Sequence, residues 1–296
     1  MIDKFLEYIT IERKYSALTA SAYKRDLYEL CSFLDTTPEE FSPKQTTEDD
    51  IKSFLIAQLD KGASARSVKR KLSAFRSFWK FLLRIGYTDV DITARIISPK
   101  TDRPLPVFYK ESEMERATAQ EDSDDDFSSV RDSLIIELLY QTGMRRAELL
   151  ALKDKDIDSY MKQIRVLGKR NKERMIPVSD DLLGMIQRYQ EYRDALPEIH
   201  DTQLLLLSDK GKPLSKTALY GIVHNRMSEV STLKKQSPHV LRHTFATTML
   251  DNGADINTIK TIMGHASLAA TQIYTHTTFE QIKAEYKRTH PRAKRK

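Results

Sequence analysis

A proline-rich stretch about one third of the way along the chain divides the sequence into two parts. The stretch SPKTDRPLP, at 98–106, contains three prolines in nine positions. Proline removes a backbone donor and restricts the residue before it, so neither a helix nor a central strand continues through this stretch. A chain of 296 residues is long enough for one or two domains. We therefore expect one domain at 1–97, a linker at 98–106 and a second domain at 107–296.

The first hundred residues have the periodicity of helices. Tyr23, Leu27, Leu30 and Leu34 recur at intervals of three and four residues, which places them on one helix face. The same spacing predicts further helices over 2–14, 48–60 and from about Ser64 to a stop at Gly86. Because no apolar–polar alternation typical of a strand occurs here, we expect an all-helical first domain with four or five helices.

The second part combines helices with one hairpin. Residues 162–178 alternate in polarity and turn at Gly168, a pattern that predicts a β-hairpin with a basic tip. Predicted helices cover 129–142, 180–194, 215–230, 239–251, 255–263 and 278–288. The predicted fold class is therefore mainly α with a small antiparallel sheet, in two domains.

The positive charge is concentrated in two segments, although the whole chain carries only +6. Residues 61–84 contain eight basic and no acidic residues, and residues 283–296 contain seven basic and one acidic residue. A helix face with cations of one sign favours contact with DNA phosphates over an ordinary solvated face, which usually mixes signs. The terminal segment is either a disordered solubilising tail or a contact for DNA or a neighbouring protomer. The candidate DNA contacts are Arg66, Lys69, Arg70, Lys71, Arg76, Lys80, Arg146 and Lys172.

Several classes of protein are disfavoured by composition. Cys31 is the one cysteine, so the chain forms no internal disulfide and contains no CxxC metal motif. No window has the roughly 18 apolar residues of a membrane span, and the start lacks the apolar segment of a signal peptide. Asp124, Asp125 and Asp126 are better explained as a solvated turn than as a metal site. We expect a cytoplasmic protein without a bound metal.

Two segments early in the second domain carry residues suited to phosphate chemistry. In TGMRRAELL, Arg145 follows a helix-ending glycine, and Glu148 stands where it can brace that turn or a neighbouring arginine. In GKRNKER, the hairpin tip presents cations, and Lys169 can reach a phosphate or donate a proton. Each segment alone is also compatible with an ordinary helix start or a polar hairpin.

Two later segments add histidines, an arginine and a tyrosine. In SPHVLRHTFA, His239 and Arg242 are three residues apart, so we expect them to share an exposed helix edge suited to an oxyanion or phosphate. The adjacent His243 is expected to be a packing residue. In MGHASLAATQIYTHT, His265 follows a glycine, and Tyr274 stands nine residues later. Any single tyrosine among thirteen is usually structural.

Together and in this order, the four segments resemble the tyrosine recombinase family of the phage-integrase type, and the Xer recombinases in particular. The resemblance spans the whole chain, and the first domain is similar to the family's SAM-like core-binding domain. The terminal TFEQIKAEYKRTHPRAKRK is more similar to the C-type than to the D-type Xer protein. The resemblance therefore implies a site-specific recombinase with a catalytic domain at 107–296.

The resemblance also implies an active site that needs neither a metal nor a cofactor. Its six catalytic positions correspond to Arg145, Lys169, His239, Arg242, His265 and Tyr274. Tyr274 would attack a DNA phosphodiester, giving a 3′-phosphotyrosyl link and a free 5′-hydroxyl. Lys169 would protonate the leaving oxygen, His239 would help to deprotonate the tyrosine, and Glu148 would brace the site.

The implied partners are a double-stranded DNA recombination site and further recombinase protomers. The family works as a tetramer on two sites, either as one protein or with a second Xer recombinase, with the C-terminal helix docked on a neighbouring protomer. The implied role is the resolution of chromosome or plasmid dimers during chromosome segregation. The residues leave open the DNA sequence, an obligate second recombinase and activation by a DNA translocase.

Three alternatives have similar features. A type IB topoisomerase uses a comparable set of residues, and an integrase of a mobile element uses the same chemistry. Such an integrase usually has an additional arm-binding domain before the core-binding helices. The third alternative is a non-catalytic DNA-binding protein, which the complete set of six residues disfavours.

Overall fold

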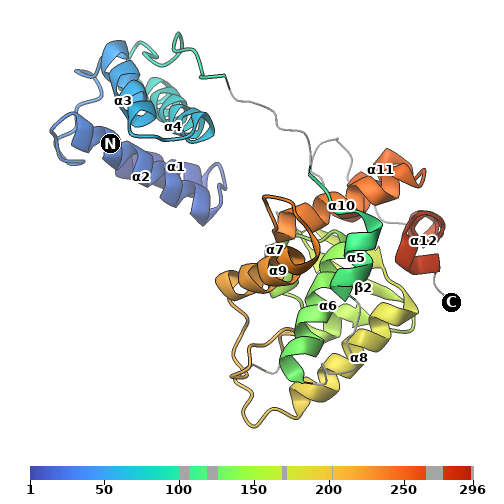
Figure 1. The fold of residues 1–296 in the computed structure, drawn as a ribbon. Coiled ribbons are helices and arrows are strands. Elements are labelled where there is room, and N and C mark those ends of the chain that lie inside the picture. The colour runs from blue at the N-terminus through green and yellow to red at the C-terminus, as the bar shows by residue number, and fades with distance from the viewer. Residues whose placement is uncertain (101–106, 119–125, 169–171, 202, 265–275, 295–296) are drawn as a thin grey trace. The chain divides into compact units, whose positions relative to one another are not determined.

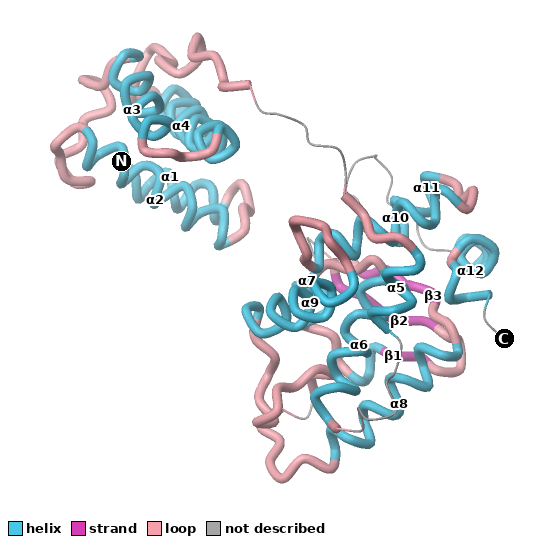
Figure 2. The backbone as a smooth tube through the Cα atoms, viewed as in Figure 1, coloured by secondary structure: helices cyan, strands magenta, loops and turns pink. Residues whose placement is uncertain are grey.

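The computed structural model describes residues 1–100, 107–118, 126–168, 172–201, 203–264 and 276–294. These residues form helices and one small sheet (Figure 1; Figure 2). Their contacts divide the chain into two units, Met1–Pro104 and Leu105–Lys296, and each unit has its own apolar core. Residues 101–106 of the predicted linker lie outside the described residues.

The N-terminal unit is helical, as its periodicity predicts. Its helices are α1 (Ile2–Ile11), α2 (Ala17–Phe33), α3 (Glu48–Asp60) and α4 (Ala65–Arg84). Ser16, Thr47 and Ser64 cap the starts of α2, α3 and α4, because each side chain accepts a hydrogen bond from a first-turn N–H. Phe75 and Trp79 of α4 are completely buried, and each such side chain stabilises the fold by roughly 2 kcal/mol.

The C-terminal unit is built around one buried helix, α6 (Phe127–Thr142). It begins at Asp126, whose carboxylate accepts a hydrogen bond from the Ser129 N–H at 2.7 Å. A helix that is apolar around most of its circumference is suited to a central position. The most extensive contacts with α6 come from α5 (Glu111–Thr118), α8 (Asp180–Asp194), α9 (Lys216–Val230) and α10 (Pro238–Asp251).

The sheet has three antiparallel strands in the order β1–β2–β3. They are β1 (Ile157–Asp158), β2 (Gln163–Leu167) and β3 (Glu173–Pro177). The predicted hairpin is confirmed as β2 and β3, with Val166 opposite Arg174 and Ile164 opposite Ile176. These four side chains are buried, so one face of the hairpin is turned into the core, and Arg174 is among its buried side chains.

The end of the chain packs on its own unit. Helix α11 (Ile256–Met263) ends at Gly264, and α12 (His276–Thr289) packs against α10, α11 and β3. Phe279, Ile282 and Tyr286 of α12 are buried, and a short 3-10 turn, Pro291–Lys294, follows. His290 is fully buried there and stacks on Tyr286. Of the two alternatives for the terminal segment, the disordered tail is therefore wrong for residues 290–293, which pack against the core.

Short elements complete the C-terminal unit. Helix α7 (Arg146–Leu150) follows α6 after a tight turn, and a single 3-10 turn, Asp154–Asp156, precedes the sheet. None of the helices in the described ranges combines the length and apolar character that crossing a membrane requires.

Candidate active site

Arg145 stands at the start of α7, directly after the turn that ends α6. The backbone N–H and the Nη1 of Arg145 donate to the two carboxylate oxygens of Glu148, each at 2.8 Å. Its Nη2 donates to the carbonyl oxygen of Gly264 at 2.8 Å. The side chain of Arg145 remains about one third exposed, so Glu148 and the Gly264 carbonyl orient the guanidinium while part of the side chain stays accessible to solvent.

Arg242 of α10 approaches the same place from another helix. It donates to the carbonyl oxygens of Gly143 and Met263, the latter at 2.7 Å. Burial and the nearby Arg145 lower the pKa of Arg242 to about 10, so the guanidinium stays charged at neutral pH. The residue is 4% exposed, which corrects the prediction that it lies on an exposed helix edge. The side chain of Arg242 instead contacts the turn after α6 and the end of α11.

Arg174 of β3 is a third arginine in this cluster, and none of the four sequence motifs indicated it as a site residue. Its Nε donates to the Ile262 carbonyl oxygen at 2.6 Å, and its two Nη groups donate to Glu148 at 3.1 and 2.7 Å. Burial raises the pKa of Glu148, but the hydrogen bonds from Arg174 and Arg145 outweigh it and hold the pKa below its usual value. The sequence feature that could have indicated Arg174 is its position as a charged residue on the apolar face of a predicted strand.

These three arginines bind three consecutive carbonyl groups at the end of α11. Ile262, Met263 and Gly264 accept from Arg174, Arg242 and Arg145, respectively. The last carbonyls of a helix have no partner within the helix and carry its negative dipole end. The arrangement therefore satisfies these carbonyls and brings cations together at Gly264, immediately before His265 in the sequence.

His239 of α10 is exposed and lies beside His243, one helical turn later. Their Nε2 atoms are 3.1 Å apart, within hydrogen-bond distance. Partial desolvation of the ring, and then the charge of His243, lower the pKa of His239 below its usual value of 6.5. His243 therefore contacts a predicted catalytic residue, whereas its place in the sequence predicted only a packing role.

The structure does not describe every predicted catalytic position. Lys169, His265 and Tyr274 lie outside the described residues. Arg146 and Lys172, predicted to contact DNA, are both exposed. The predicted acidic turn lies outside the described residues except for Asp126, which caps α6. Across the described ranges, no group of three or more acidic, histidine or cysteine side chains is arranged to hold a metal ion.

The basic helix α4 divides its cations between the surface and the interior. Arg66, Lys69 and Lys80 are exposed. Lys71 is 5% exposed and pairs with Asp26 and Glu29 of α2. This burial corrects the expectation that Lys71 belongs to a DNA-contacting surface, because its charge is neutralised inside the unit.

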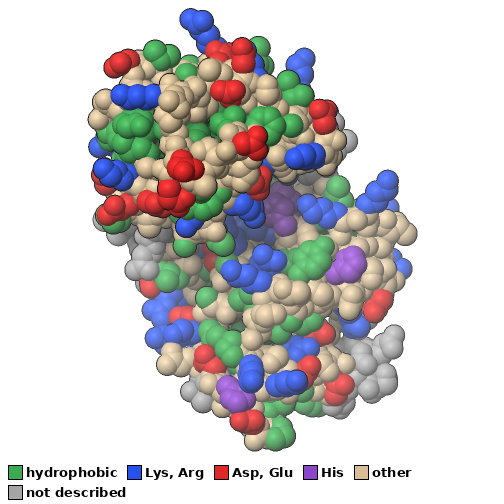
Figure 3. Space-filling view, turned by 90° about the vertical axis from the view of Figure 1, so that its left-hand side faces the viewer, with side chains coloured by type: hydrophobic (Ala, Val, Ile, Leu, Met, Phe, Trp, Pro, Cys, Tyr) green, Lys and Arg blue, Asp and Glu red, His purple; other side chains and the backbone are tan. Residues whose placement is uncertain are grey.

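Two further cations of α4 also have partners within the protein. Arg70 pairs with both carboxylate oxygens of Asp26, and Nη2 of Arg76 donates to the Ile96 carbonyl oxygen at 2.6 Å. Side chains of both signs are interspersed on the face drawn in Figure 3. The uniform charge of α4 in the sequence is therefore partly compensated by acidic residues of α2.

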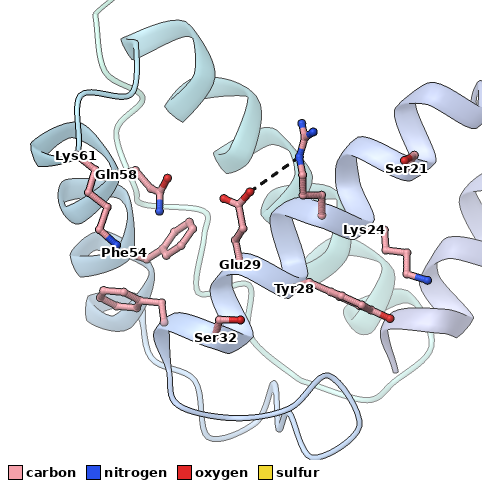
Figure 4. Close-up of a pocket in the computed structure, with 10 residues that line it drawn as sticks. Ser21, Lys24, Tyr28, Glu29, Ser32, Phe54, Gln58 and Lys61 are labelled. Carbon is pink, nitrogen blue, oxygen red and sulfur yellow. Dashed lines mark ion pairs between the residues drawn. The ribbon is translucent and has the colours of Figure 1, made fainter.

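A surface pocket of the N-terminal unit lies between α2 and α3. Lys24, Tyr28 and Glu29 of α2 line it from one helix, and Phe54 and Gln58 of α3 line it from the other (Figure 4). None of the predicted DNA-contacting side chains lines this pocket. The pocket is thus separate from the exposed cations of α4.

Comparison with known proteins follows the division into two units. A family profile described as "Phage integrase family" matches residues 108–281, and one described as "Phage integrase, N-terminal SAM-like domain" matches residues 2–86. "Tyrosine recombinase XerD" of Listeria monocytogenes is 34% identical over 99% of both chains. "Tyrosine recombinase XerC" of L. monocytogenes serotype 4a is 36% identical over 98% of this chain and 97% of the relative. Relatives of both the C-type and the D-type therefore match at similar identity.

A solved structure shows the same fold. The "XerH site-specific recombinase bound to palindromic difH substrate: post-cleavage complex" is 21% identical, with a TM-score of 0.70. The match covers 97% of this chain and 84% of that one. The mainly helical, two-domain fold class predicted from the sequence is confirmed by this likeness and by the family profiles.

Proposed function

Because the chain belongs to the phage integrase family and is a site-specific tyrosine recombinase of the Xer type, we propose that Tyr274 is the nucleophile of its DNA strand exchange. The Oη atom of Tyr274 attacks a phosphorus of double-stranded DNA. The bond to the 5′-oxygen breaks, leaving a 3′-phosphotyrosyl link and a free 5′-hydroxyl. A 5′-hydroxyl from a second duplex reverses the step and joins the exchanged strands.

The observation that supports this proposal most strongly is the convergence of Arg145 and Arg242 at the end of α11. Both guanidinium groups are held by backbone carbonyls immediately before His265 in the sequence, and Tyr274 follows ten residues after Gly264. The transition state carries excess negative charge on its phosphoryl oxygens, and preoriented guanidinium donors stabilise such charge. Arg145 has the exposure that direct contact with a phosphate requires.

Proton transfer is assigned to the remaining residues of the set. A free tyrosine has a pKa near ~10, so Tyr274 needs a base or a cationic site at neutral pH. His239 has a lowered pKa and is therefore neutral and able to accept a proton. Lys169 donates a proton to the leaving 5′-oxygen, and His265 donates a hydrogen bond to the phosphate. The phosphotyrosyl link conserves the energy of the broken bond, so the reaction requires no cofactor.

The proposed biological role is the resolution of chromosome or plasmid dimers in the cytoplasm. Recombination joins two duplexes, so the active assembly is a tetramer on two sites, formed by this chain alone or with a second Xer recombinase. The chain's similarity to XerC and XerD along nearly its whole length supports this role over that of a mobile-element integrase. Activation by a DNA translocase belongs to the same proposal.

Footprinting combined with adduct trapping on genomic fragments tests this function. Each footprinted segment is rebuilt as a nicked duplex, so that cleavage releases a short strand and traps the covalent complex. We expect a protein–DNA adduct at one footprinted site, with the protein on the 3′ phosphate, and an equal yield in EDTA. Footprints without an adduct would instead support a non-catalytic DNA-binding protein.

A further inference from the structure

We propose that Arg174 is a positioning residue that holds Arg145 and the end of α11 in their reactive arrangement, an inference that rests on the proposed function. Among the described residues, Arg174 donates to the Ile262 carbonyl oxygen and to Glu148, not to Arg145 or Arg242, and it is almost completely buried. It therefore acts on the phosphate site through the groups that it binds.

The guanidinium of Arg174 is fixed on two sides. Its Nε donates to Ile262 of α11, while Nη1 and Nη2 donate to the two carboxylate oxygens of Glu148 in α7. A planar guanidinium has donors in fixed directions and can make both sets of contacts at once, whereas a lysine ammonium is a single point of charge. The side chain thus sets the separation between α7 and the end of α11.

Glu148 transmits this constraint to Arg145. The carboxylate that binds Arg174 also accepts from the backbone N–H and the Nη1 of Arg145, each at 2.8 Å. Both oxygens of Glu148 are shared between the two arginines, so a shift of Arg174 moves the anchor of Arg145. If Glu148 lost the hydrogen bonds from Arg174, its buried charge would be destabilised, because one cation alone compensates the cost of its desolvation poorly.

The end of α11 is shaped to accept Arg174. Gly264 has a φ of +65°, and a Cβ at this position would lie 3.1 Å from Nη1 and 3.2 Å from Cζ of Arg174. A glycine at this position therefore makes room for the guanidinium and also ends the helix. Because Gly264 immediately precedes His265, Arg174 constrains the backbone at the start of the segment that contains the proposed nucleophile.

The hairpin register places Arg174 where it can bind two other elements at once. Arg174 pairs with Val166 on the buried face of β2 and β3, and the hairpin tip that contains Lys169 lies just before it in the sequence. One side chain therefore joins the strand that follows Lys169, the helix that follows Arg145 and the helix that precedes His265.

The test uses single-turnover cleavage of the nicked recombination site by the full-length protein. At saturating protein the first-order rate constant measures the cleavage step within the complex of folded enzyme and DNA. A separate titration gives the Kd for DNA. We expect Arg174→Lys to lower the rate constant about ten- to a hundredfold through misplacement of Arg145, with a Kd within about threefold of wild type. In a Glu148→Gln background the same substitution should lower the rate constant less than about threefold further, because the two residues act as one unit.

Matched variants separate positioning from general damage. Arg165→Lys alters an arginine of the adjacent strand β2, which pairs with Asp156 at 2.9 Å outside the cluster, and it should leave the rate constant unchanged. Gly264→Ala, which crowds Arg174 without removing it, should lower the rate constant at unchanged Kd and serves if Arg174→Lys fails to fold. The inference would be refuted if Arg174→Lys and Glu148→Gln lowered the rate constant independently, so that their fold-effects multiply in the double variant. It would also be refuted if Arg174→Lys had the same rate constant as Arg165→Lys. Absence of an adduct with the wild type would instead contradict the proposed function.

Discussion

At the scale of single residues, sequence motifs identified Arg145 and Arg242 but not Arg174, because the contacts of Arg174 join elements that are far apart in the sequence. Arg145 and Arg242 stand in recognisable segments. Arg174 became visible only once β3 was placed beside α7 and α11, a long-range arrangement that periodicity does not encode. The prediction that Lys71 contacts DNA is wrong for a similar reason, because the acidic residues that neutralise its charge belong to a different helix, α2.

The contact between His239 and His243 predicts a shift in the pH dependence of cleavage. His239 must be neutral to accept a proton, and its lowered pKa keeps it neutral further into the acid range. Lys235 and Arg242 also act on His239 but remain in place when His243 is changed. In His243→Asn the pKa of His239 should rise, so the acid limb of the cleavage profile should move to higher pH.

Single-turnover cleavage rates between about pH 5 and 8, the range in which histidine titrates, measure this shift. His200→Asn is the matched control. His200 lies outside α10, and its Nε2 is 3.4 Å from a carboxylate oxygen of Glu198. An acid limb that stays in place or moves to lower pH in His243→Asn would show that His243 does not tune the base.

At the scale of elements, apolar spacing predicted most helices and the hairpin because most of them bury one face, whereas α6 is buried on nearly all sides. The short helix α7 and strand β1 were not predicted, since five and two residues contain too little periodicity to detect. The C-terminal residues were misread because composition recorded their charge but not their partners. Arg292 pairs with Glu137 at 3.0 Å, and its guanidinium lies over the ring of Tyr140.

Removal of the Arg292 side chain should therefore destabilise the C-terminal unit. Arg292→Ala leaves Glu137 buried without its cation, and breaking such a buried pair costs about 3–5 kcal/mol. Arg288→Ala, which removes an exposed ion pair to Glu285, should cost about 1 kcal/mol or less. Urea unfolding followed by circular dichroism measures both variants, and equal losses would contradict the anchoring role of the terminal turn.

The turn between α6 and α7 should be sensitive to any added side chain. Gly143 has a φ of +56°, and a Cβ there would lie 2.4 Å from the ring of buried Phe245. Gly143→Ala should destabilise the unit by roughly 1–3 kcal/mol and displace Arg145. Gly184→Ala, in an exposed position of α8 with open space around it, should instead stabilise by up to about 1 kcal/mol. Thermal melts that rank the two variants in the opposite order would contradict this account of the turn.

At the scale of the whole molecule, the chain has two units with separate cores. We propose that the helical N-terminal unit contributes DNA binding and that the C-terminal unit carries out the chemistry. The exposed cations of α4 should contribute to affinity but not to chemistry. Replacing Arg66, Lys69 and Lys80 together by Ala should reduce the salt dependence of DNA binding by about 0.9 per lost phosphate contact. The cleavage rate at saturating DNA should not change.

Lys52→Ala is the control for this triple variant, because Lys52 of α3 pairs with Glu48 at 2.9 Å on the same unit. Binding isotherms at several salt concentrations give the slopes. An unchanged slope in the triple variant would mean that α4 does not face the phosphates.

The proposed strand exchange depends most directly on Tyr274, one of thirteen tyrosines in the chain. The direct measurement is mass spectrometry of the peptide that remains attached to DNA after the trapped adduct is digested with protease. The predicted result is a single phosphotyrosyl peptide containing Tyr274, with no adduct from Tyr274→Phe although this variant still binds the site. An adduct on another tyrosine, or one that persists in Tyr274→Phe, would contradict the account.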